Sequence, residues 1–161
     1  MGWATWQGLS YAPGNYTVTL TSTAQGSKPA AVLGSYLSRS PGPPAALRLS
    51  LDWGGSGPGG ALLGGRRDAA LVRVAVVDSS GVVVVGASHS VQYSVAGPGE
   101  LIGLGNGGHQ NHIPGQGSSS MPVYSGLGRA VLRGLQATGQ PLRLSVSAQG
   151  LAGDELDIEV V

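Results

Sequence analysis

The sequence predicts an all-β protein, built as a sandwich or a barrel, and three observations support this fold class. Short segments alternate apolar and polar residues with period two, as half-buried strands do. The 29 glycines and 10 prolines among the 161 residues fall between these segments, giving turn signals roughly every 8 to 15 residues, a spacing typical of sandwiches. No segment keeps a helical apolar period over several turns.

The first expected element is a strand near the N-terminus, followed by a linker. Tyr16, Val18 and Leu20 share one face of this strand, and threonines occupy the other. Residues 41–44 read PGPP, a stiff sequence typical of linkers. We therefore expect a small β segment at 1–40, a linker at 41–44, and a sandwich of about seven or eight strands at 45–161.

The expected strands of this sandwich are recognised by alternation or by short apolar runs. They lie at residues 47–51, 71–77, 82–85, 91–95, 130–132, 142–146 and 156–160. A flexible Gly-rich loop or hairpin is expected at 54–65, and a long loop at 103–120. Asn106-Gly107 is a tight-turn signal, and a short helical turn is predicted at 125–127.

The composition excludes several classes of protein and partner. A hydrophobic content of 41% with a net charge of +1 argues against disorder. Without cysteine there is neither a disulfide nor a thiolate metal site. Only Arg66 and Arg67 are adjacent among the basic residues, and no apolar run is long enough for a membrane helix. We expect no nucleic-acid partner and no membrane partner.

The N-terminal residues bear on the location of the protein. The first ten lack the basic region and apolar core of a signal peptide, although a signal can lie upstream of Met1. These residues leave the location open, with a secreted or periplasmic one favoured. Asn15 begins an Asn-Tyr-Thr sequon after a Pro-Gly turn, which predicts a glycosylation site in a secreted eukaryotic protein.

Catalytic and cofactor-binding patterns are not recognisable. The eight acidic residues lie mostly in turns or at strand ends, as solvated side chains do. The segment LGLGNGG lacks the Lys-Ser/Thr ending of a phosphate-binding loop. His109 and His112 have a spacing that allows metal binding, with an Asp, a Glu or His89 from elsewhere as the third ligand, but polar loop histidines are the favoured interpretation. We predict no catalytic residue, no metal and no cofactor.

Aromatic residues suggest a second interpretation. Trp3 and Trp6 lie near the N-terminus, and Trp53 borders the Gly-rich loop. Exposed aromatic rings stack on sugars, so these three residues are candidates for a carbohydrate-binding face. Such residues also fill small cores or domain interfaces, and no polar sugar-clamping residues surround them in the sequence.

Four segments of the chain resemble a known family. These are WQGLSYAPGNYTVTL from Trp6, ALVRVAVVDSSGVVV from Ala69, VQYSVAGPGELIGLGNGG from Val91, and the segment from Tyr124 that contains the ATGQ turn and the AQGL corner. Together they resemble the C-terminal part of family 2 glycoside hydrolases of the β-galactosidase type. Ile113 departs from the pattern, because the family has an acidic residue after the loop histidine.

The resemblance implies an immunoglobulin-like sandwich that serves as a non-catalytic accessory domain, because the catalytic glutamates of these enzymes lie on a barrel that this sequence lacks. It implies that residues 1–40 end a preceding small β domain. It also implies that Asn106, His109 and His112 lie in a loop that packs against other domains of the parent glycosidase. The alternatives are a carbohydrate-binding module and a cell-surface adhesion-type domain.

Overall fold

The computed structural model describes residues 5, 7–8, 10, 14–65 and 68–161. Trp3, Trp6 and the Arg66-Arg67 pair lie outside the described residues. The chain divides into two compact units, Met1–Gly42 and Pro43–Val161. No helix in the described part of the chain is long and apolar enough to cross a membrane.

The first unit contains an antiparallel hairpin of two strands, β1 (Asn15–Thr21) and β2 (Val32–Arg39). β1 covers the strand expected near the N-terminus, whereas β2 was not predicted. The reason is that β2, VLGSYLSR, has large apolar residues on both of its faces, so it lacks alternation. All residues of both strands are exposed, so neither face of the ribbon is buried by the described residues of this unit.

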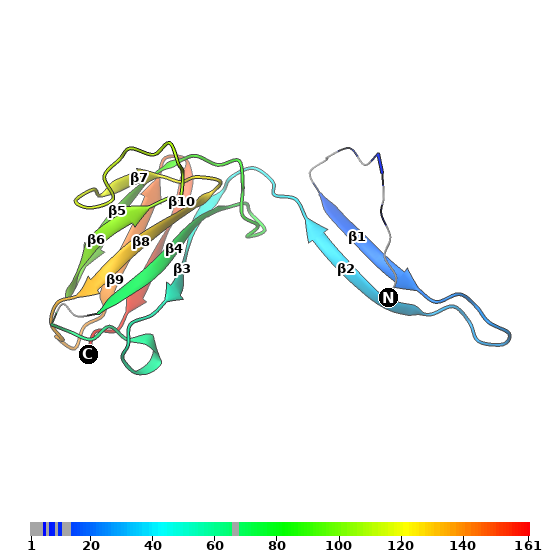
Figure 1. Ribbon diagram of the computed structural model, residues 1–161, viewed down its shortest axis with the longest axis horizontal. Helices are drawn as coiled ribbons and strands as arrows, with labels where there is room; N and C mark the ends of the chain where they lie inside the picture. Colours follow the sequence, from blue (N-terminus) through cyan, green and yellow to red (C-terminus); the bar gives the residue numbers. More distant parts are fainter. Residues whose placement is uncertain (1–4, 6, 9, 11–13, 66–67) are drawn as a thin grey trace. The chain divides into compact units, whose positions relative to one another are not determined.

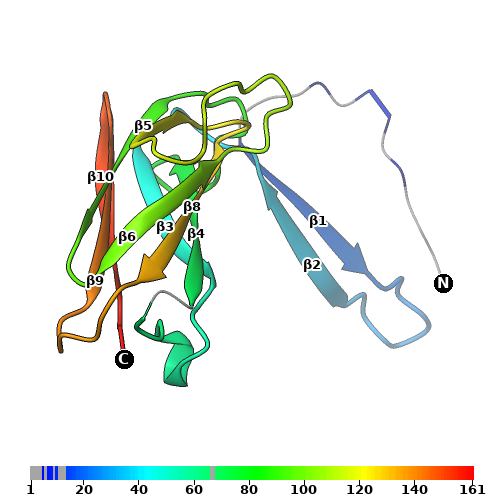
Figure 2. The same ribbon diagram turned by 60° about the vertical axis from the view of Figure 1, so that its left-hand side comes forward.

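The second unit is a sandwich of eight strands, which confirms the predicted all-β class (Figures 1 and 2). Its strands are β3 (Ala46–Trp53), β4 (Ala69–Val77), β5 (Ser90–Ala96), β6 (Gly99–Gly105), β7 (Ser120–Pro122), β8 (Leu127–Gly134), β9 (Leu142–Ala148) and β10 (Leu151–Ile158). They follow the order β6-β8-β4-β3-β10-β9-β5-β7. The first four form one layer and the last four the other, joined where Ala152 of β10 pairs with Ala46 of β3.

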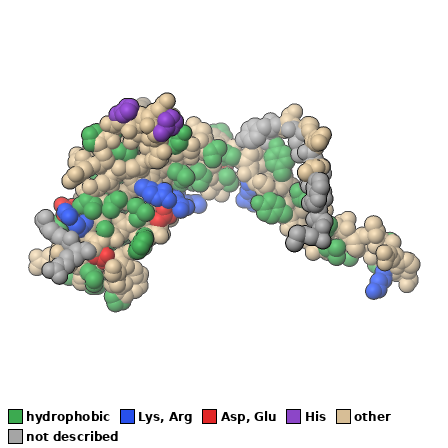
Figure 3. All heavy atoms as spheres, viewed as in Figure 1, with side chains coloured by type: hydrophobic (Ala, Val, Ile, Leu, Met, Phe, Trp, Pro, Cys, Tyr) green, Lys and Arg blue, Asp and Glu red, His purple; other side chains and the backbone are tan. Residues whose placement is uncertain are grey.

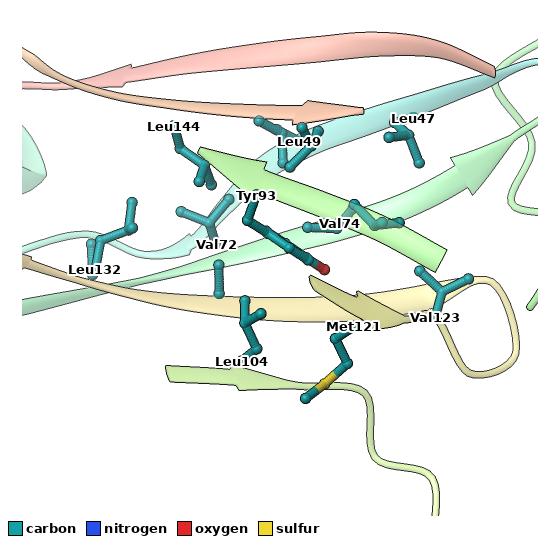
Figure 4. Close-up of a cluster of buried hydrophobic side chains, with 14 of the residues drawn as sticks. Leu47, Leu49, Val72, Val74, Tyr93, Leu104, Met121, Val123, Leu132 and Leu144 are labelled. Carbon is teal, nitrogen blue, oxygen red and sulfur yellow. The ribbon is translucent and has the colours of Figure 1, made fainter. Parts of the chain in front are cut away.

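The core lies between the two layers and is formed by every second residue of the strands (Figure 4). This arrangement explains the alternation in the sequence, because successive side chains of a strand point to opposite faces. The largest fully buried side chains are Leu62, Val72, Val74, Val76, Val91, Met121, Leu132, Leu142 and Leu144. Tyr93 is buried among them, and burial raises the pKa of its hydroxyl to about 12.

Two expectations for the second unit are wrong. Residues 82–85 are not a strand, because only Val83 forms a bridge, to Val77, before the chain turns away. Residues 125–127 are not helical, because Ser125 and Gly126 have φ of 52° and 74°. Positive φ at both central residues defines the tight hairpin turn that joins two twisted strands, and Tyr124 pairs with Leu127 across it.

Two further strands, β6 and β7, lie within or next to the segment expected to be a long loop. β6 contains three glycines, and its alternation is broken where a bulge falls between Leu101 and Gly103. β7 has only three residues. Local sequence does not specify either strand, since both depend on pairing with strands that are distant in the sequence. The true loop spans residues 106–119.

The Gly-rich loop at 54–65 is organised around the carboxylate of Asp68. Asp68 Oδ2 accepts hydrogen bonds from the amides of Ser56 at 2.7 Å and Leu63 at 2.9 Å, and Oδ1 accepts from Ala69 at 3.0 Å. These backbone bonds, chiefly those from Leu63 and Ser56, lower the pKa of Asp68 below its ordinary value of 3.8. Gly55 is required beside it, because a Cβ there would lie 2.2 Å from the Ala61 carbonyl oxygen.

We expect Asp68→Asn to lower the free energy of unfolding of the second unit by about 1–2 kcal/mol at neutral pH, because an amide group would face backbone donors. The folded-state pKa is depressed, so the contribution is present above pH 3.8 and is lost as the pH falls through the lower folded pKa. Urea denaturation at several pH values should show the gap from the wild type shrinking below pH 3.8. A difference in stability between Asp68→Asn and the wild type that is independent of pH would contradict this role. Glu155→Gln, which changes an exposed carboxylate in the same way, is the matched control.

Candidate functional site

The loop at 106–119, which joins β6 to β7, is held by its asparagines. Asn106 Oδ1 accepts a hydrogen bond from the Gly108 amide at 2.9 Å, and Asn106 Nδ2 donates to the Pro122 carbonyl at 2.9 Å. Gly107 has a φ of 73°, in the left-handed region that an Asn-Gly pair favours. Asn111 Oδ1 accepts from the Ile113 amide at 3.2 Å. Asn106 is therefore a residue that shapes the loop from within.

His109 and His112 lie on the exposed part of this loop, and Figure 3 shows histidine side chains at the surface of this end of the sandwich. Within the described ranges, the structure assembles no group of three His, Asp or Glu side chains that would hold a metal ion, so His89 does not complete a site with them. Ile113 beside them is 42% exposed. The role of Asn106, His109 and His112 in contacts between domains stays a prediction.

Exposed apolar side chains gather at the opposite end of the sandwich. Leu51, Trp53, Leu63 and Val161 are 41%, 72%, 41% and 52% exposed. We call these four residues the lower apolar end. Leu63 and Val161 line a hollow of about 570 Å³ there. A surface that faces only solvent seldom carries several exposed apolar side chains at one end. Protein interfaces, by contrast, are enriched in aromatic residues such as tryptophan. Trp53 as a sugar-binding residue stays a prediction.

A charged cluster lies on the outer face of the β6-β8-β4-β3 layer. Arg73 and Arg129 both donate through Nη2 to the carboxylate of Asp52, each at 2.8 Å. The Asp52 side chain is only 15% exposed, since the two guanidinium groups cover it. On the same layer, Arg133 contacts Glu100 through Nη2 at 2.6 Å. Sequence reasoning did not find the Asp52 cluster, because it depends on the register of three strands.

Next to this cluster the layer has a cleft of about 440 Å³, between the turn at Asn106 and the hairpin turn that follows Tyr124. The floor is open because Gly105 has no side chain: a Cβ placed there would have no atom within 4 Å. Tyr124 is 49% exposed, and Arg129 lines the cleft as well. We call this site the Tyr124 cleft.

The outer face of the other layer is polar. Serines and acids line a shallow hollow of about 640 Å³ over β5, β9 and β10. Arg143 Nε donates to Asp157 Oδ1 at 2.7 Å and Nη2 to Oδ2 at 2.8 Å. This pairing lowers the pKa of Asp157 and raises that of Arg143, with Glu155 adding to the latter. Serine and acidic side chains are depleted at protein interfaces, so this face is typical of solvent-facing surface.

The acidic residues are engaged by partners within the sandwich. Seven of the eight accept a hydrogen bond or form an ion pair: Asp52, Asp68, Asp78, Glu100, Asp154, Glu155 and Asp157. Asp154 Oδ2 accepts from the Leu49 amide at 2.6 Å, and Asp78 Oδ1 caps its own turn by accepting from Ser80 and Val82. These carboxylates stabilise turns, bulges and strand pairs.

Asn15 lies in the first unit, at the start of β1, and is exposed. The residue two positions later in its sequon, Thr17, is also exposed. Glycosylation at Asn15 stays a prediction.

Taken together, this fold and these sites define an immunoglobulin-like β-sandwich domain with structural carboxylates, an exposed apolar end and a cleft at the other end. The family model for the glycoside hydrolase family 2 C-terminal domain 5 matches residues 60–157, most of the sandwich. The chain therefore belongs to this family, which confirms the resemblance to the C-terminal part of family 2 glycoside hydrolases. No curated protein matches the chain.

Solved structures agree on the fold. A β-glycosidase from Bacteroides vulgatus superposes with a TM-score of 0.74 at 20% identity, covering 94% of this chain and 18% of that one. A glycosyl hydrolase family 2 member from Bacteroides cellulosilyticus gives 0.73 at 20% identity, with 93% and 19% coverage. A family 2 β-glucuronidase gives 0.70 at 18% identity, with 97% and 15% coverage. The chain thus spans less than a fifth of the length of these proteins.

Proposed function

We propose that this chain is a non-catalytic accessory domain of a larger family 2 glycoside hydrolase, in which it packs against and supports the catalytic barrel. The observation that carries the proposal is the family match over residues 60–157, in a chain that spans less than a fifth of similar enzymes. The engaged carboxylates support it. Retaining glycosidases need two carboxylates about 5–5.5 Å apart and free to act as nucleophile and acid.

The lower apolar end is the surface that supports docking best. Trp53 is the most exposed large apolar side chain of the sandwich, and Leu51, Leu63 and Val161 are exposed as well. Burying such a group against another domain is favourable by roughly 25 cal/mol per Å² of apolar surface. The loop at 106–119, with Asn106, His109 and His112, is the second candidate contact, at the opposite end of the strands.

The first unit supports the proposal that residues 1–40 end a preceding small β domain, joined by the linker at 41–44. Tyr16 and Val18 of β1 and Tyr36 of β2 share one face of the hairpin, and all three are exposed. An isolated two-stranded hairpin is at best marginally stable in water. Further strands of the parent protein covering this face would supply the missing apolar burial.

The parent protein would hydrolyse terminal β-glycosidic bonds by the two-carboxylate retaining mechanism. The sequence resemblance favours a β-galactosidase, whereas the similar structures are a β-glycosidase and a β-glucuronidase. Both sugars therefore belong in the assay.

We expect the purified chain to release no chromophore from an aryl β-galactoside or an aryl β-glucuronide, whereas the longer gene product that contains it hydrolyses one of them. Turnover by the chain that survives repurification would overturn the non-catalytic assignment.

A variant in the longer gene product tests the supporting role. Trp53→Ala should lower the thermal midpoint of the whole enzyme and leave that of the isolated chain unchanged, because Trp53 is exposed in the chain by itself. Val85→Ala, 66% exposed at the opposite end of the strands, is the matched control. Equal midpoints for the Trp53→Ala enzyme and the wild type would exclude docking through the lower apolar end.

A further inference from the structure

The Tyr124 cleft has the form of a small-molecule site. Such sites are concave and mostly apolar, with a few polar groups that fix orientation, and their volumes begin at about 300 Å³. The cleft, at about 440 Å³, is bounded by the Tyr124 ring, the Leu127 side chain and the glycine backbone of β6. Asn106 and Arg129 supply polar groups at its edge.

The Tyr124 ring is held in place before any ligand arrives. Its backbone amide donates to the Leu127 carbonyl at 2.9 Å, and the Leu127 amide donates back at 3.0 Å. The ring lies against Gly108, where a Cβ would be 3.2 Å from Tyr124 Cδ2. The side chain is nevertheless 49% exposed. A fixed ring with an exposed surface is a stacking platform for a flat, partly apolar ligand such as a pyranose.

The charge beside the platform is positive. Arg73 and Arg129 share the one carboxylate of Asp52, so these three groups together carry a net charge of +1. The nearest other pair on the layer, Arg133 with Glu100, is balanced. The Arg129 side chain is 41% exposed, and only one of its five N–H donors is needed for the contact with Asp52 at 2.8 Å. An arginine in this position favours a planar carboxylate as its ligand.

We propose that the Tyr124 cleft binds an acidic oligosaccharide, with a hexuronate ring stacked on Tyr124 and its carboxylate paired with Arg129. The choice of a sugar over other anions rests on the proposed function, because a glycosidase accessory domain meets carbohydrate chains. In this role the cleft holds part of a polymeric substrate without cleaving it. It differs from the Trp53 site predicted from the sequence, since Trp53 does not line it.

The test is calorimetric titration of the intact chain with tetragalacturonate, and with cellotetraose as the neutral sugar of equal length. We expect saturable binding of tetragalacturonate that weakens with added salt, and at least ten-fold weaker binding of cellotetraose. Tyr124→Ala should weaken tetragalacturonate binding about ten-fold, the equivalent of about 1.4 kcal/mol. Arg129→Gln should remove the preference for the acidic sugar.

Two matched glycine variants distinguish sugar binding in the cleft from binding elsewhere on the surface. Gly105→Leu fills the cleft and should abolish binding, whereas Gly34→Leu in β2, also in open space, should leave it unchanged. Tyr36→Ala, in a residue that is 70% exposed, controls for loss of an exposed tyrosine. Thermal melts establish that each variant is folded.

Several results would overturn the proposal. These are equal affinity for the two sugars, no binding at millimolar tetragalacturonate, binding that Gly105→Leu does not change, and tighter binding of an oligoglutamate peptide than of the sugar. The titrations need no turnover, so their outcome is independent of whether the longer gene product hydrolyses the aryl glycosides.

Discussion

Leu132→Ala is expected to lower the free energy of unfolding of the sandwich by about 2–5 kcal/mol, the range for Leu→Ala in tightly packed cores. Leu132 is fully buried in β8, where it pairs with Ala70 on one side and Leu101 on the other (Figure 4). Ala70, the neighbour on β4, is too small to extend into the vacated volume. Urea denaturation followed by far-UV circular dichroism measures the change.

The control for this variant is Leu63→Ala, which removes the same atoms from a side chain that is 41% exposed. Its effect should stay below about 1 kcal/mol, since the exposed leucine leaves no enclosed cavity when it is shortened. Equal losses in the two variants would mean that the core around Leu132 collapses to fill the space, contrary to the packing described above.

Asp154→Ala is the second change with a large expected effect, because this residue joins the two layers. β10 bulges between Leu151 and Asp154, so backbone pairing with β3 is limited to Ala152 and Ala46. The Asp154 carboxylate takes the place of the missing pairing by accepting from the Leu49 amide at 2.6 Å. Removing it leaves a partly buried amide without an acceptor, which costs about 1–3 kcal/mol.

Asp154→Asn distinguishes the hydrogen bond from the charge. The amide oxygen of asparagine still accepts from Leu49, so this variant should recover most of the stability lost in Asp154→Ala. Glu155→Ala, at the next position and exposed, should have little effect. If Asp154→Asn and Asp154→Ala unfold at the same urea concentration, the bond to Leu49 does not contribute.

The strands that could be predicted are those with one buried and one exposed face. β9 and the second half of β10 alternate regularly because every second position faces the core between the layers, and β4 was recognisable as an apolar run whose last four residues are all buried. β2 and β6 were missed for opposite reasons. β2 is apolar on both faces, and β6 is rich in glycine, so neither has the period that marks a half-buried strand. The misassigned helical turn after Tyr124 is a two-residue turn whose φ values local sequence does not reveal.

The candidate sites likewise divide into those that a local sequence signal marks and those that depend on strand pairing. Trp53 and the loop with Asn106 were recognisable because an isolated tryptophan and an Asn-Gly pair are local signals. The Asp52 cluster with Arg73 and Arg129 was not, since its members come from three strands and meet only through their register. Tyr124 was overlooked as a site residue because the cleft brings it beside Gly105 and Asn106, which are distant from it in the sequence.

The sequence by itself determined the all-β class, the positions of most core residues and the family, because alternation and turn residues act over a few neighbouring positions. Tertiary structure decided the order of the strands, the closure of the two layers through Asp154, and the cleft between two distant turns. Each of these depends on which strands pair and in what register. Pairing is set by the summed burial of the whole core, a property that no single segment carries.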